Sequence, residues 1–492
     1  MRGLALALCA LPAAAIAQPR FEPVSVPEHQ YTGGWEHFVG GGVAVFDCDG
    51  DALPEVFLAG GDSPALLLHN DGEMRFSAAS FPEMTGVTGA YPIDIDADGH
   101  LDLFVLRAGE NRVLRGQPRC GFEEAFSIPG GAAWSTAFTA WWQDEGRPHM
   151  AVGNYVDRDD PEGPFFACDD NTLIEPAEDG WTASALSPGF CPLSLLAARD
   201  ARGRQTLRLS NDRQYYVRGG YEQMWDIADR RFLTEADGWA PISIWGMGIA
   251  SADLTGDGRD EVMLTSMGDQ LLQIAQPDGS YAAAPYEIGS YAQRPYRGDD
   301  GRPSTGWHAQ FEDIDNDGLL DLFIAKGNVD QMPSNAIRDP NNLLMQQPDG
   351  SFVEAAMEAG IDSDARARGG ALADLDGDGR VDLVVNNRRA PFEVWRNVTE
   401  GAGHWLGLDL RQPGGNRDAI GARVTVTARD RSQSRQRVIG GGHAGGQLLP
   451  LHFGLGAEEE VSVRVEWPDG TVTGPHPAEA GAVLLLDRSA LP

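Results

Sequence analysis

Asp374 begins the stretch Asp-Leu-Asp-Gly-Asp-Gly-Arg-Val-Asp, with carboxylates at positions 1, 3, 5 and 9 and glycine at position 6. Carboxylates this close repel one another unless a cation lies among them. Ca²⁺ accepts about six to eight oxygen ligands in a flexible shell, and alternate side chains of a tight loop supply several of them. Gly379, at position 6, permits the positive φ that such a sharp turn requires. The stretch therefore predicts a calcium-binding loop.

The pattern occurs five times, and we name each copy by its first residue: loop 47, loop 94, loop 253, loop 313 and loop 374. Loop 47 has Ala52 in place of the glycine, and loop 253 has Thr255 in place of a carboxylate. The predicted metal ligands are Asp47, Asp49, Asp51, Glu55, Asp94, Asp96, Asp98, Asp102, Asp253, Thr255, Asp257, Glu261, Asp313, Asp315, Asp317, Asp321, Asp374, Asp376, Asp378 and Asp382. Acidic surface turns without metal are the alternative, which like-charge repulsion disfavours. We therefore expect about five Ca²⁺ ions, one for each loop.

EF-hand loops begin in the same way, but they end with a bidentate glutamate at position 12 and lie between two helices. Position 12 of the five loops is apolar in every case: Leu58, Val105, Leu264, Ile324 and Val385. A run typical of a β-strand follows each loop, as in residues 381–385, so position 9 lies at the start of a strand. The loops are therefore not EF-hands.

The loops recur at a spacing that indicates a repeat protein. They begin at residues 47, 94, 253, 313 and 374, so the spacings are 47, 159, 60 and 61 residues. The long interval has room for two more units, and degenerate copies are visible at 141–152 and 198–211. These copies lack the ligand set, so we expect them to bind no metal. Four short strands per unit, with turns such as Asn70-Asp71-Gly72, predict an all-β chain with a seven-bladed β-propeller.

The two ends of the repeat region indicate how the ring closes. The last unit has three predicted strands, and its fourth is missing before the chain changes character. Residues 21–24, Phe-Glu-Pro-Val, are similar to the fourth strands of other units, such as 76–79. We therefore expect the N-terminal strand to complete the last blade and remove the open sheet edge.

Beyond residue 400 the chain alternates apolar and polar residues, as in 423–427 and 461–465, which is typical of strands with one buried face. Pro468-Asp469-Gly470 is a turn sequence. We predict a propeller over residues 18–399 and a separate small β domain over residues 400–492, joined near 397–403.

The repeats resemble FG-GAP or VCBS repeats, the calcium-loop blades also found in integrin α heads. The tail resembles the ASPIC/UnbV domain at residues 404–408, 416–426, 451–456 and 463–470. Together they resemble the bacterial form of the cartilage acidic protein family over nearly the whole mature chain. Residues 440–447, Gly-Gly-Gly-His-Ala-Gly-Gly-Gln, depart from the family's usual turn with aromatic or Ser residues, so no family role is transferred to this loop. The resemblance implies a calcium-binding scaffold for interaction or adhesion.

Residues 1–17 have the features of a signal peptide: Arg2, an apolar run from Leu4, and Ala15-Ile16-Ala17 before Gln18. The run is too short to span a bilayer. We expect cleavage after Ala17, a secreted or periplasmic protein, and no membrane insertion. The formal net charge of −35 argues against nucleic acid and anionic membranes as partners. The expected partner is an unidentified protein or glycan.

Four cysteines follow the signal peptide. Cys168 and Cys191 flank a segment rich in Pro, Gly and Asp and suit a disulfide in an oxidising compartment, whereas pairing of Cys48 with Cys120 is less favoured. We interpret His443, in the glycine-rich loop, as a solvated or backbone-bonded residue rather than part of a site.

The sequence contains no GxSxG elbow, HExxH helix, P-loop, dinucleotide fingerprint or haem-attachment motif. We therefore assign no catalytic residue and no organic cofactor. One alternative to a scaffold is a lyase or hydrolase of extracellular polysaccharide, with its active site at the channel mouth. In an enzyme of this kind Trp141, Trp142, Trp245 and Trp307 would stack on a sugar, but we expect them to pack between blades. Another alternative is a purely structural component of a surface layer or assembly.

Overall fold

A computed structural model describes residues 17–126, 128–144, 146–161, 167–212, 219–298, 301–330, 332–429 and 431–491. Residues 1–16 of the expected signal peptide and Glu145 of the third repeat lie outside the described residues. The helical elements of the described chain are short: η1 (Trp35–His37), η3 (Glu235–Asp237), η4 (Tyr286–Ile288), α1 (Ala356–Ala359) and η5 (Arg488–Ala490). None of these helices is long and apolar enough to cross a bilayer. The expected all-β class is confirmed.

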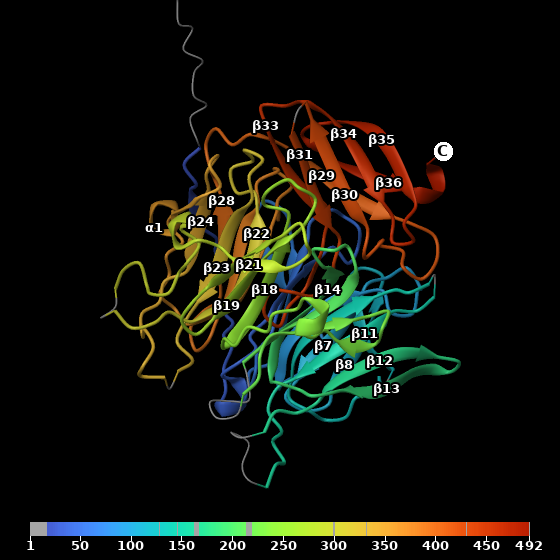
Figure 1. Cartoon of the computed structure of the whole chain (residues 1–492), viewed down its shortest axis with the longest axis vertical. Coiled ribbons are helices and arrows are strands. Elements are labelled where there is room, and N and C mark those ends of the chain that lie inside the picture. The colour runs from blue at the N-terminus through green and yellow to red at the C-terminus, as the bar shows by residue number, and fades with distance from the viewer. Residues whose placement is uncertain are drawn as a thin grey trace, which may run out of the picture.

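Up to residue 397 the described strands form seven antiparallel sheets (Figure 1). The first two sheets contain β2 (Val43–Phe46), β3 (Glu55–Leu58), β4 (Leu66–Asn70) and β5 (Phe76–Ala78), then β6 (Val87–Ile93), β7 (Asp102–Arg107), β8 (Arg112–Gln117) and β9 (Gly121–Phe126). The third and fourth contain β10 (Ser135–Trp141), β11 (His149–Asn154), β12 (Asn171–Ala177) and β13 (Gly180–Leu186), then β14 (Pro192–Arg199), β15 (Gln205–Asn211), β16 (Gln223–Asp226) and β17 (Arg231–Phe232).

The remaining three sheets of this region follow the same order. The fifth contains β18 (Gly246–Ala252), β19 (Glu261–Ser266), β20 (Leu271–Ala275) and β21 (Tyr281–Ala283), and the sixth contains β22 (Gly306–Glu312), β23 (Asp321–Lys326), β24 (Asn342–Gln346) and β25 (Phe352–Glu354). The seventh contains β26 (Ala367–Ala373), β27 (Asp382–Asn387), β28 (Glu393–Asn397) and β1 (Phe21–Pro23).

The first strands of the seven sheets form the inside of a ring. Each contacts the next in turn, from β2 through β6, β10, β14, β18 and β22 to β26, and β26 contacts β2 again. Strands β2, β6, β10 and β26 are buried along their whole length, whereas the outer strands β5 and β25 expose side chains. Apolar side chains of neighbouring sheets pack together, as Ala137 of β10 does with Leu195 of β14. The chain is therefore a β-propeller.

Strand β1 closes this ring by pairing with β28. Phe21 lies opposite Asn397 and Pro23 opposite Trp395, and the Val24 N–H donates to Val394 O at 2.8 Å. The two paired segments are more than 370 residues apart in sequence. The expectation that the N-terminal strand supplies the fourth strand of the last sheet is confirmed.

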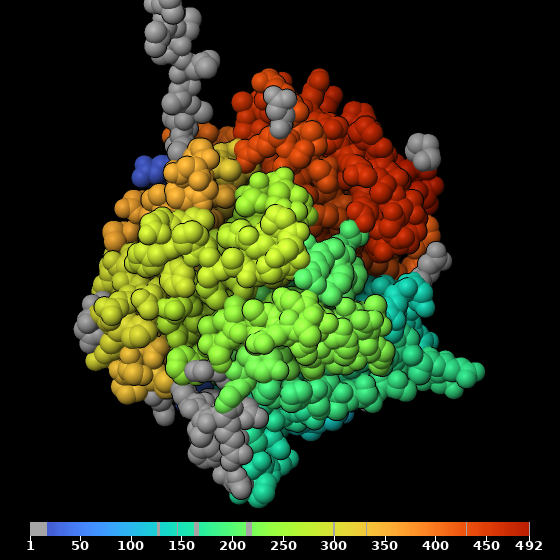
Figure 2. Space-filling view, viewed as in Figure 1, coloured from blue at the N-terminus to red at the C-terminus, as the bar shows by residue number. Residues whose placement is uncertain are grey.

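Beyond residue 400 the chain forms two further sheets with a core of their own. One has the order β33-β29-β36, from β29 (His404–Arg411), β33 (Leu451–Gly456) and β36 (Ala482–Asp487). The other has the order β31-β30-β34-β35, from β30 (Arg423–Ala428), β31 (Arg431–Gln436), β34 (Glu460–Glu466) and β35 (Val472–Glu479). Leu408, Val424, Phe453 and Trp467 are among the buried residues between them. Figures 1 and 2 show this tail, in red, against the ring. The exact boundary at residues 399 and 400 remains a prediction.

The tail is not separate from the propeller, and our expectation of a separate domain is wrong on this point. Strand β32 (Gln447–Leu448) of the tail runs parallel to β2 and adds a fifth strand to the first sheet. The residues before it bridge to three more inner strands: Gly440 to Leu196, Gly442 to Ile249 and Gly445 to Ala90. Residues 439–446, which we call the channel plug, therefore fill the middle of the ring.

Glycines permit this close approach of the plug to the inner strands. A Cβ atom on Gly42 or Gly89 would overlap the Ala444 carbonyl, and one on Gly445 would overlap the backbone of Val43. Sequence spacing gave no sign of this, because the glycines lie in three distant segments and meet only when the ring closes.

His443 lies at the centre of the plug and is fully buried, so the expectation of a solvated side chain is wrong, although the expected backbone bond is present. Its Nε2 accepts the Gly40 N–H at 3.2 Å, and its own N–H donates to His308 Nδ1 at 3.2 Å. Burial lowers the pKa of His443 to about 3, so the ring is neutral. The ring of Trp307 packs on it with centroids 5.1 Å apart, so Trp307 is internal, as expected.

Deleting residues 18–30 tests the closure of the ring. The deletion removes β1 and leaves the outer edge of β28 without its partner, so amide exchange at Glu393–Asn397 should accelerate. Hydrogen-exchange mass spectrometry measures this directly, with β11 as the internal reference. Unchanged protection of β28 in a folded deletion variant would contradict the closure.

Candidate metal centres

The five acidic loops occupy the same place in their sheets, between the first and second strands: loop 47 follows β2, loop 94 follows β6, loop 253 follows β18, loop 313 follows β22 and loop 374 follows β26. The carboxylate at position 9 is the first residue of the second strand in every case. The sequence prediction that these loops precede strands is therefore confirmed.

The backbone of all five loops is folded around the first carboxylate. The aspartate at position 1 accepts the N–H of position 6 in each loop, over 2.7 to 3.1 Å. The aspartate at position 5 accepts the N–H of position 7 in each loop, over 2.7 to 3.0 Å. Position 6 has positive φ throughout, and Ala52 adopts φ 67° where the other loops have glycine. The Ala52 variant thus keeps the loop geometry.

The carboxylate at position 9 is buried in all five loops: Glu55, Asp102, Glu261, Asp321 and Asp382 are each no more than 1% exposed. Each accepts the N–H of position 2 of its own loop, over 2.8 to 3.2 Å. In three loops the same carboxylate also accepts an N–H from the third strand of the sheet, donated by Gly116, Gln346 or Asn397. These bonds hold the carboxylate against the loop.

Three of the loops bring a set of carboxylate oxygens within 4.8 Å of one another: Asp47, Asp49 and Asp51; Asp94, Asp96 and Asp102; and Asp313, Asp315 and Asp321. In loop 313 all three side chains are buried. Thr255 of loop 253 is exposed, so that loop has the poorest ligand set. In these three loops the structure brings together three of the four side chains that the sequence pattern selected as ligands, and the full ligand sets remain a prediction.

Several oxygens of these loops are buried without a hydrogen-bond partner: Asp94 Oδ1, Glu261 Oε1 and Asp315 Oδ2. A buried carboxylate oxygen without a partner costs free energy of about 1–3 kcal/mol or more. Carboxylate oxygens at this spacing are the ligands that Ca²⁺ prefers. The residues present therefore fit a hard cation.

Burial also disfavours the ionised form of these side chains. It raises the pKa of Asp102 and of Glu261 to about 7, and the carboxylates beside each group add to the effect. Burial raises the pKa of Asp313 and of Asp321 well above the ordinary aspartate range, again with neighbouring carboxylates contributing. A divalent ion among these groups would offset both the burial and the repulsion that raise these pKa values.

Two loops already have a protein cation beside position 3. Arg115, on β8, contacts Asp96 of loop 94 at 2.8 Å, and Arg396, on β28, contacts Asp376 of loop 374 at 2.7 Å. Each of these arginines directly precedes the third-strand residue whose N–H binds the position-9 carboxylate. In the sheet of loop 313 the equivalent residue is Met345, so this loop has no arginine at that place. The loops therefore differ in how much of their negative charge the chain itself compensates.

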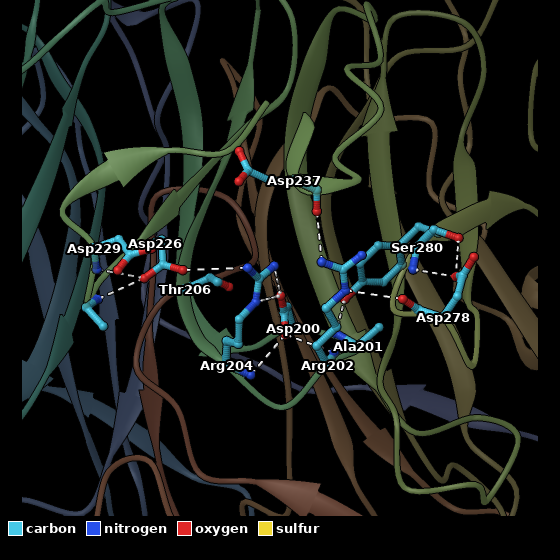
Figure 3. Close-up of polar contacts among 12 residues, drawn as sticks. Asp200, Ala201, Arg202, Arg204, Thr206, Asp226, Asp229, Asp237, Asp278 and Ser280 are labelled. Atoms are coloured by element: carbon cyan, nitrogen blue, oxygen red, sulfur yellow. Dashed lines mark hydrogen bonds and ion pairs between the residues drawn. The ribbon is translucent and has the colours of Figure 1, made fainter. Parts of the chain in front are cut away.

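The fourth sheet shows what replaces the metal loop where the ligands are missing (Figure 3). Asp200 directly follows β14, as the position-1 aspartates follow their strands, and its Oδ1 accepts the N–H groups of Arg202 and Arg204 at 2.9 Å. Its Oδ2 accepts Arg204 Nε at 2.9 Å and Nη2 at 2.6 Å. Arg204 also lies 3.7 Å from Asp226. The Arg204 guanidinium thus occupies the place where the five acidic loops are predicted to hold a cation.

Sequence reasoning missed this role of Asp200. The available signal was an aspartate directly after the strand, followed by Ala-Arg-Gly-Arg, but the search required several acidic positions. In the third sheet Asp144 accepts the Gly146 N–H at 2.7 Å. None of the predicted metal ligands lies in the described part of that turn.

Both disulfides considered from the sequence are present. Cys168 bonds to Cys191, as expected, and Cys48 bonds to Cys120, the pairing that was less favoured. Cys48 is position 2 of loop 47, and Cys120 lies in the turn between β8 and β9 of the second sheet. This bond therefore ties loop 47 to the neighbouring sheet.

The tail lies over several of the loops. Arg417 donates to Gly99 O of loop 94, and Arg431 donates to Gly318 O of loop 313. Ser434 Oγ donates to Asp253 Oδ2 at 2.8 Å. A Cβ atom on Gly379 of loop 374 would overlap the Trp405 ring. The tail and the loops therefore share one surface.

Comparisons with known proteins place two family matches on these elements. The FG-GAP-like repeat model matches residues 47–105 and 313–385, and the ASPIC and UnbV model matches residues 412–490. Cartilage acidic protein 1 of Xenopus tropicalis is 25% identical over 502 residues, which cover 91% of this chain and 73% of that protein. The proteins of that name from Mus musculus and Homo sapiens are 32% identical over 165 residues, which cover 32% of this chain. The matched segment spans about a quarter of each of these two relatives.

Solved structures with similarity to this chain include BBS1N in complex with ARL6DN, with a TM-score of 0.47 at 10% identity, covering 77% of this chain and 97% of that chain. YCF48 bound to D1 peptide has a TM-score of 0.45 at 10% identity and covers 79% of this chain and 100% of that chain. The BP39L lectin from Burkholderia pseudomallei has a TM-score of 0.43 at 10% identity and covers 89% of this chain and 99% of that chain.

Replacing Arg204 by alanine tests whether its guanidinium neutralises Asp200. The variant leaves the Asp200 carboxylate, 2% exposed, without its cation, so the free energy of unfolding should fall by about 1–3 kcal/mol. The loss should be the same with and without calcium, because this loop lacks the ligand set. Urea unfolding measures it.

Arg75→Ala is the control, since Arg75 pairs with Glu73 on the surface and should contribute less than about 0.5 kcal/mol. Equal losses in the two variants would show that Arg204 does not replace a cation.

Proposed function

We propose that this chain, which has FG-GAP-like repeats and an ASPIC and UnbV domain and is related to cartilage acidic protein 1, is an exported calcium-binding scaffold for interactions with other molecules. The observation that supports calcium most directly is the set of buried carboxylate oxygens without partners in loops 94, 253 and 313. The shared backbone geometry of the five loops adds weight to this observation, because each loop gathers several carboxylates.

Calcium fits these loops better than magnesium. Mg²⁺ requires a compact octahedron and retains several waters, whereas Ca²⁺ accepts a flexible shell of carboxylate, carbonyl and water oxygens. Each loop supplies four acidic or hydroxyl side chains, and a backbone carbonyl at position 7 is expected to add a ligand. Extracellular calcium modules have Kd values of about 10⁻⁴ to 10⁻³ M, so occupancy would require a calcium-rich compartment.

Export is supported by the disulfides as well as by the N-terminal sequence. Two disulfides, Cys48–Cys120 and Cys168–Cys191, use all four cysteines outside residues 1–17. Disulfides persist in oxidising compartments and are rare in the cytosol. Cys48 lies within loop 47, so reduction of the Cys48–Cys120 bond would be expected to disturb the geometry of that loop.

A scaffold is also favoured by the middle of the ring. A propeller enzyme with its active site at the channel mouth needs room for substrate there, and in this chain residues 439–446 occupy that room. The alternative of a polysaccharide lyase or hydrolase therefore has no specific observation in its favour. The binding partner we propose is a protein or glycan that contacts the outer surface of the blades.

Metal analysis of chelated and refilled protein tests the proposal. We expect about five Ca²⁺ ions per chain and a melting temperature that falls on addition of EDTA, because a site at 100 times its Kd stabilises the fold by about 2.7 kcal/mol. Two or fewer ions, or a melting temperature unaffected by EDTA, would show that the loops are acidic turns rather than metal sites.

Single variants locate the ions. Asp317→Ala and Asp378→Ala each remove the position-5 side chain from a loop with the full ligand set, so each should lose one ion and lower the melting temperature. Asp144→Ala, in the third sheet, is the control and should lose no ion. Isothermal titration should find the weakest site in loop 253, where Thr255 replaces a carboxylate.

A further inference from the structure

The strands that precede and follow the channel plug both contact loop 313. Before the plug, Arg431 at the start of β31 donates to Asp317 O at 3.0 Å and to Gly318 O. After the plug, His452 Nε2 of β33 lies 2.7 Å from Asn316 Oδ1, and the Gly456 N–H donates to Asn316 O at 2.7 Å. Strands β31 and β33, which we call the stems of the plug, therefore both rest on residues 316–318.

The two stems are also joined to each other above the loop. Gln433 Nε2 of β31 donates to Gly454 O of β33 at 2.7 Å. Gly454 lies so close to the Asp313 carboxylate that a Cβ atom there would overlap Asp313 Oδ2. The Gly403 N–H, at the start of the tail, donates to Asp315 O at 2.8 Å. Tail backbone thus covers the predicted ligands at positions 1 and 3.

Loop 313 is also the loop in which an ion has the most to compensate. Asp313, Asp315 and Asp321 are each no more than 2% exposed, and Asp315 Oδ2 has no hydrogen-bond partner. Loop 47 is the opposite case: Asp49 and Asp51 are exposed, and no described tail residue forms a hydrogen bond with that loop. The chain therefore contains one loop whose carboxylates are buried beneath the tail and one with the same pattern whose carboxylates at positions 3 and 5 are exposed.

We propose that an ion bound at loop 313 and the inserted channel plug stabilise each other, so that calcium holds the channel closed and its removal loosens the plug. This inference rests on the proposed function, because it requires that loop 313 binds calcium. Its basis is that the stems contact the backbone of residues 316–318, whose conformation the ion would fix.

This coupling is reciprocal. If bound calcium favours insertion of the plug by some factor, then the inserted plug raises the calcium affinity of loop 313 by the same factor. Coupling factors between linked sites are typically about 5–150. Weakening of the stems should therefore lower calcium affinity at loop 313, and loss of the ion should weaken the hydrogen bonds of the plug.

The first test measures hydrogen exchange of the plug in the full chain, in calcium and in EDTA. The amides of Gly441, Gly442 and Gly446 donate to Leu195 O, Ile249 O and Ala90 O, so they report insertion of the plug. We expect their exchange to accelerate about fivefold or more in EDTA, while β11 of the third sheet is unchanged. Equal protection with and without calcium would overturn the proposal.

A matched pair of variants assigns the effect to loop 313. Asp317→Ala and Asp51→Ala remove the same position-5 side chain, the first from the loop that the stems contact and the second from the exposed loop 47. Each should lose one ion, but only Asp317→Ala should accelerate exchange of the plug in saturating calcium. Similar acceleration in both variants would mean that calcium acts on the whole fold and would refute a specific link with loop 313.

The reverse direction is tested with Gly454→Ala, which displaces the stem at Asp313, against Gly34→Ala, which adds a methyl group where no atom lies within 4 Å. Calorimetric titration should show about fivefold or greater loss of calcium affinity at one site in Gly454→Ala and no loss in Gly34→Ala. Unchanged affinity would overturn the proposal. If Gly454→Ala does not fold, the first test and the aspartate pair decide the question.

These outcomes distinguish failure of the inference from failure of the proposed function. If the wild-type chain binds no calcium at equilibrium, the proposed function fails and the inference with it. If it binds about five ions while the plug exchanges at the same rate with and without them, only the inference fails.

Discussion

The structure depends on the compensation of buried carboxylates at the ends of the inner strands. Each of the five acidic loops buries a carboxylate at position 9, where backbone N–H groups hold it in place. Burial in a medium of low dielectric disfavours the charged form, and a second carboxylate nearby adds repulsion. A positive charge at this place is therefore a condition for a tightly packed blade, and the loops between β2 and β3 and their counterparts are built around it.

The chain meets this condition in more than one way. In the fourth sheet Arg204 donates two hydrogen bonds to one oxygen of Asp200, so the compensating charge belongs to the chain itself. In loops 94 and 374, Arg115 and Arg396 supply part of the charge. Loop 313 has its carboxylates buried and a stem of the tail above them, so it would depend most on an ion. The sheets of one ring therefore differ in how much positive charge the chain itself places beside these carboxylates.

The tail fills the channel of the propeller. A propeller with an empty channel offers a concave site, whereas here residues 439–446 lie among the inner strands and His443 is neutral and buried. The plug contributes hydrogen bonds to strands of several sheets, which a small ring of short strands would otherwise leave unpaired on its inner side. The surface left for partners is therefore the outer surface of the blades and the tail.

The sequence alone determined the features that repeat locally. The spacing of Asp, Gly and Asp fixes a loop because each side chain bonds to a backbone N–H only a few residues away, and the same bonds are present in all five copies. The strands after the loops, the β1 pairing and the tail strands around 423–427 and 461–465 followed from pattern as well. Whether ions occupy the loops stays a prediction.

Only the tertiary structure decided the features that join distant segments. Gly42, Gly89 and Gly445 have no local reason to be glycine, and their purpose is visible only where the plug meets the inner strands. The burial of His443, the contacts of Arg431 and His452 with loop 313 and the Cys48–Cys120 bond are of the same kind. A periodic pattern reports which face of a strand is buried, but not which distant segment covers it, because that depends on how the closed ring and the tail fit together.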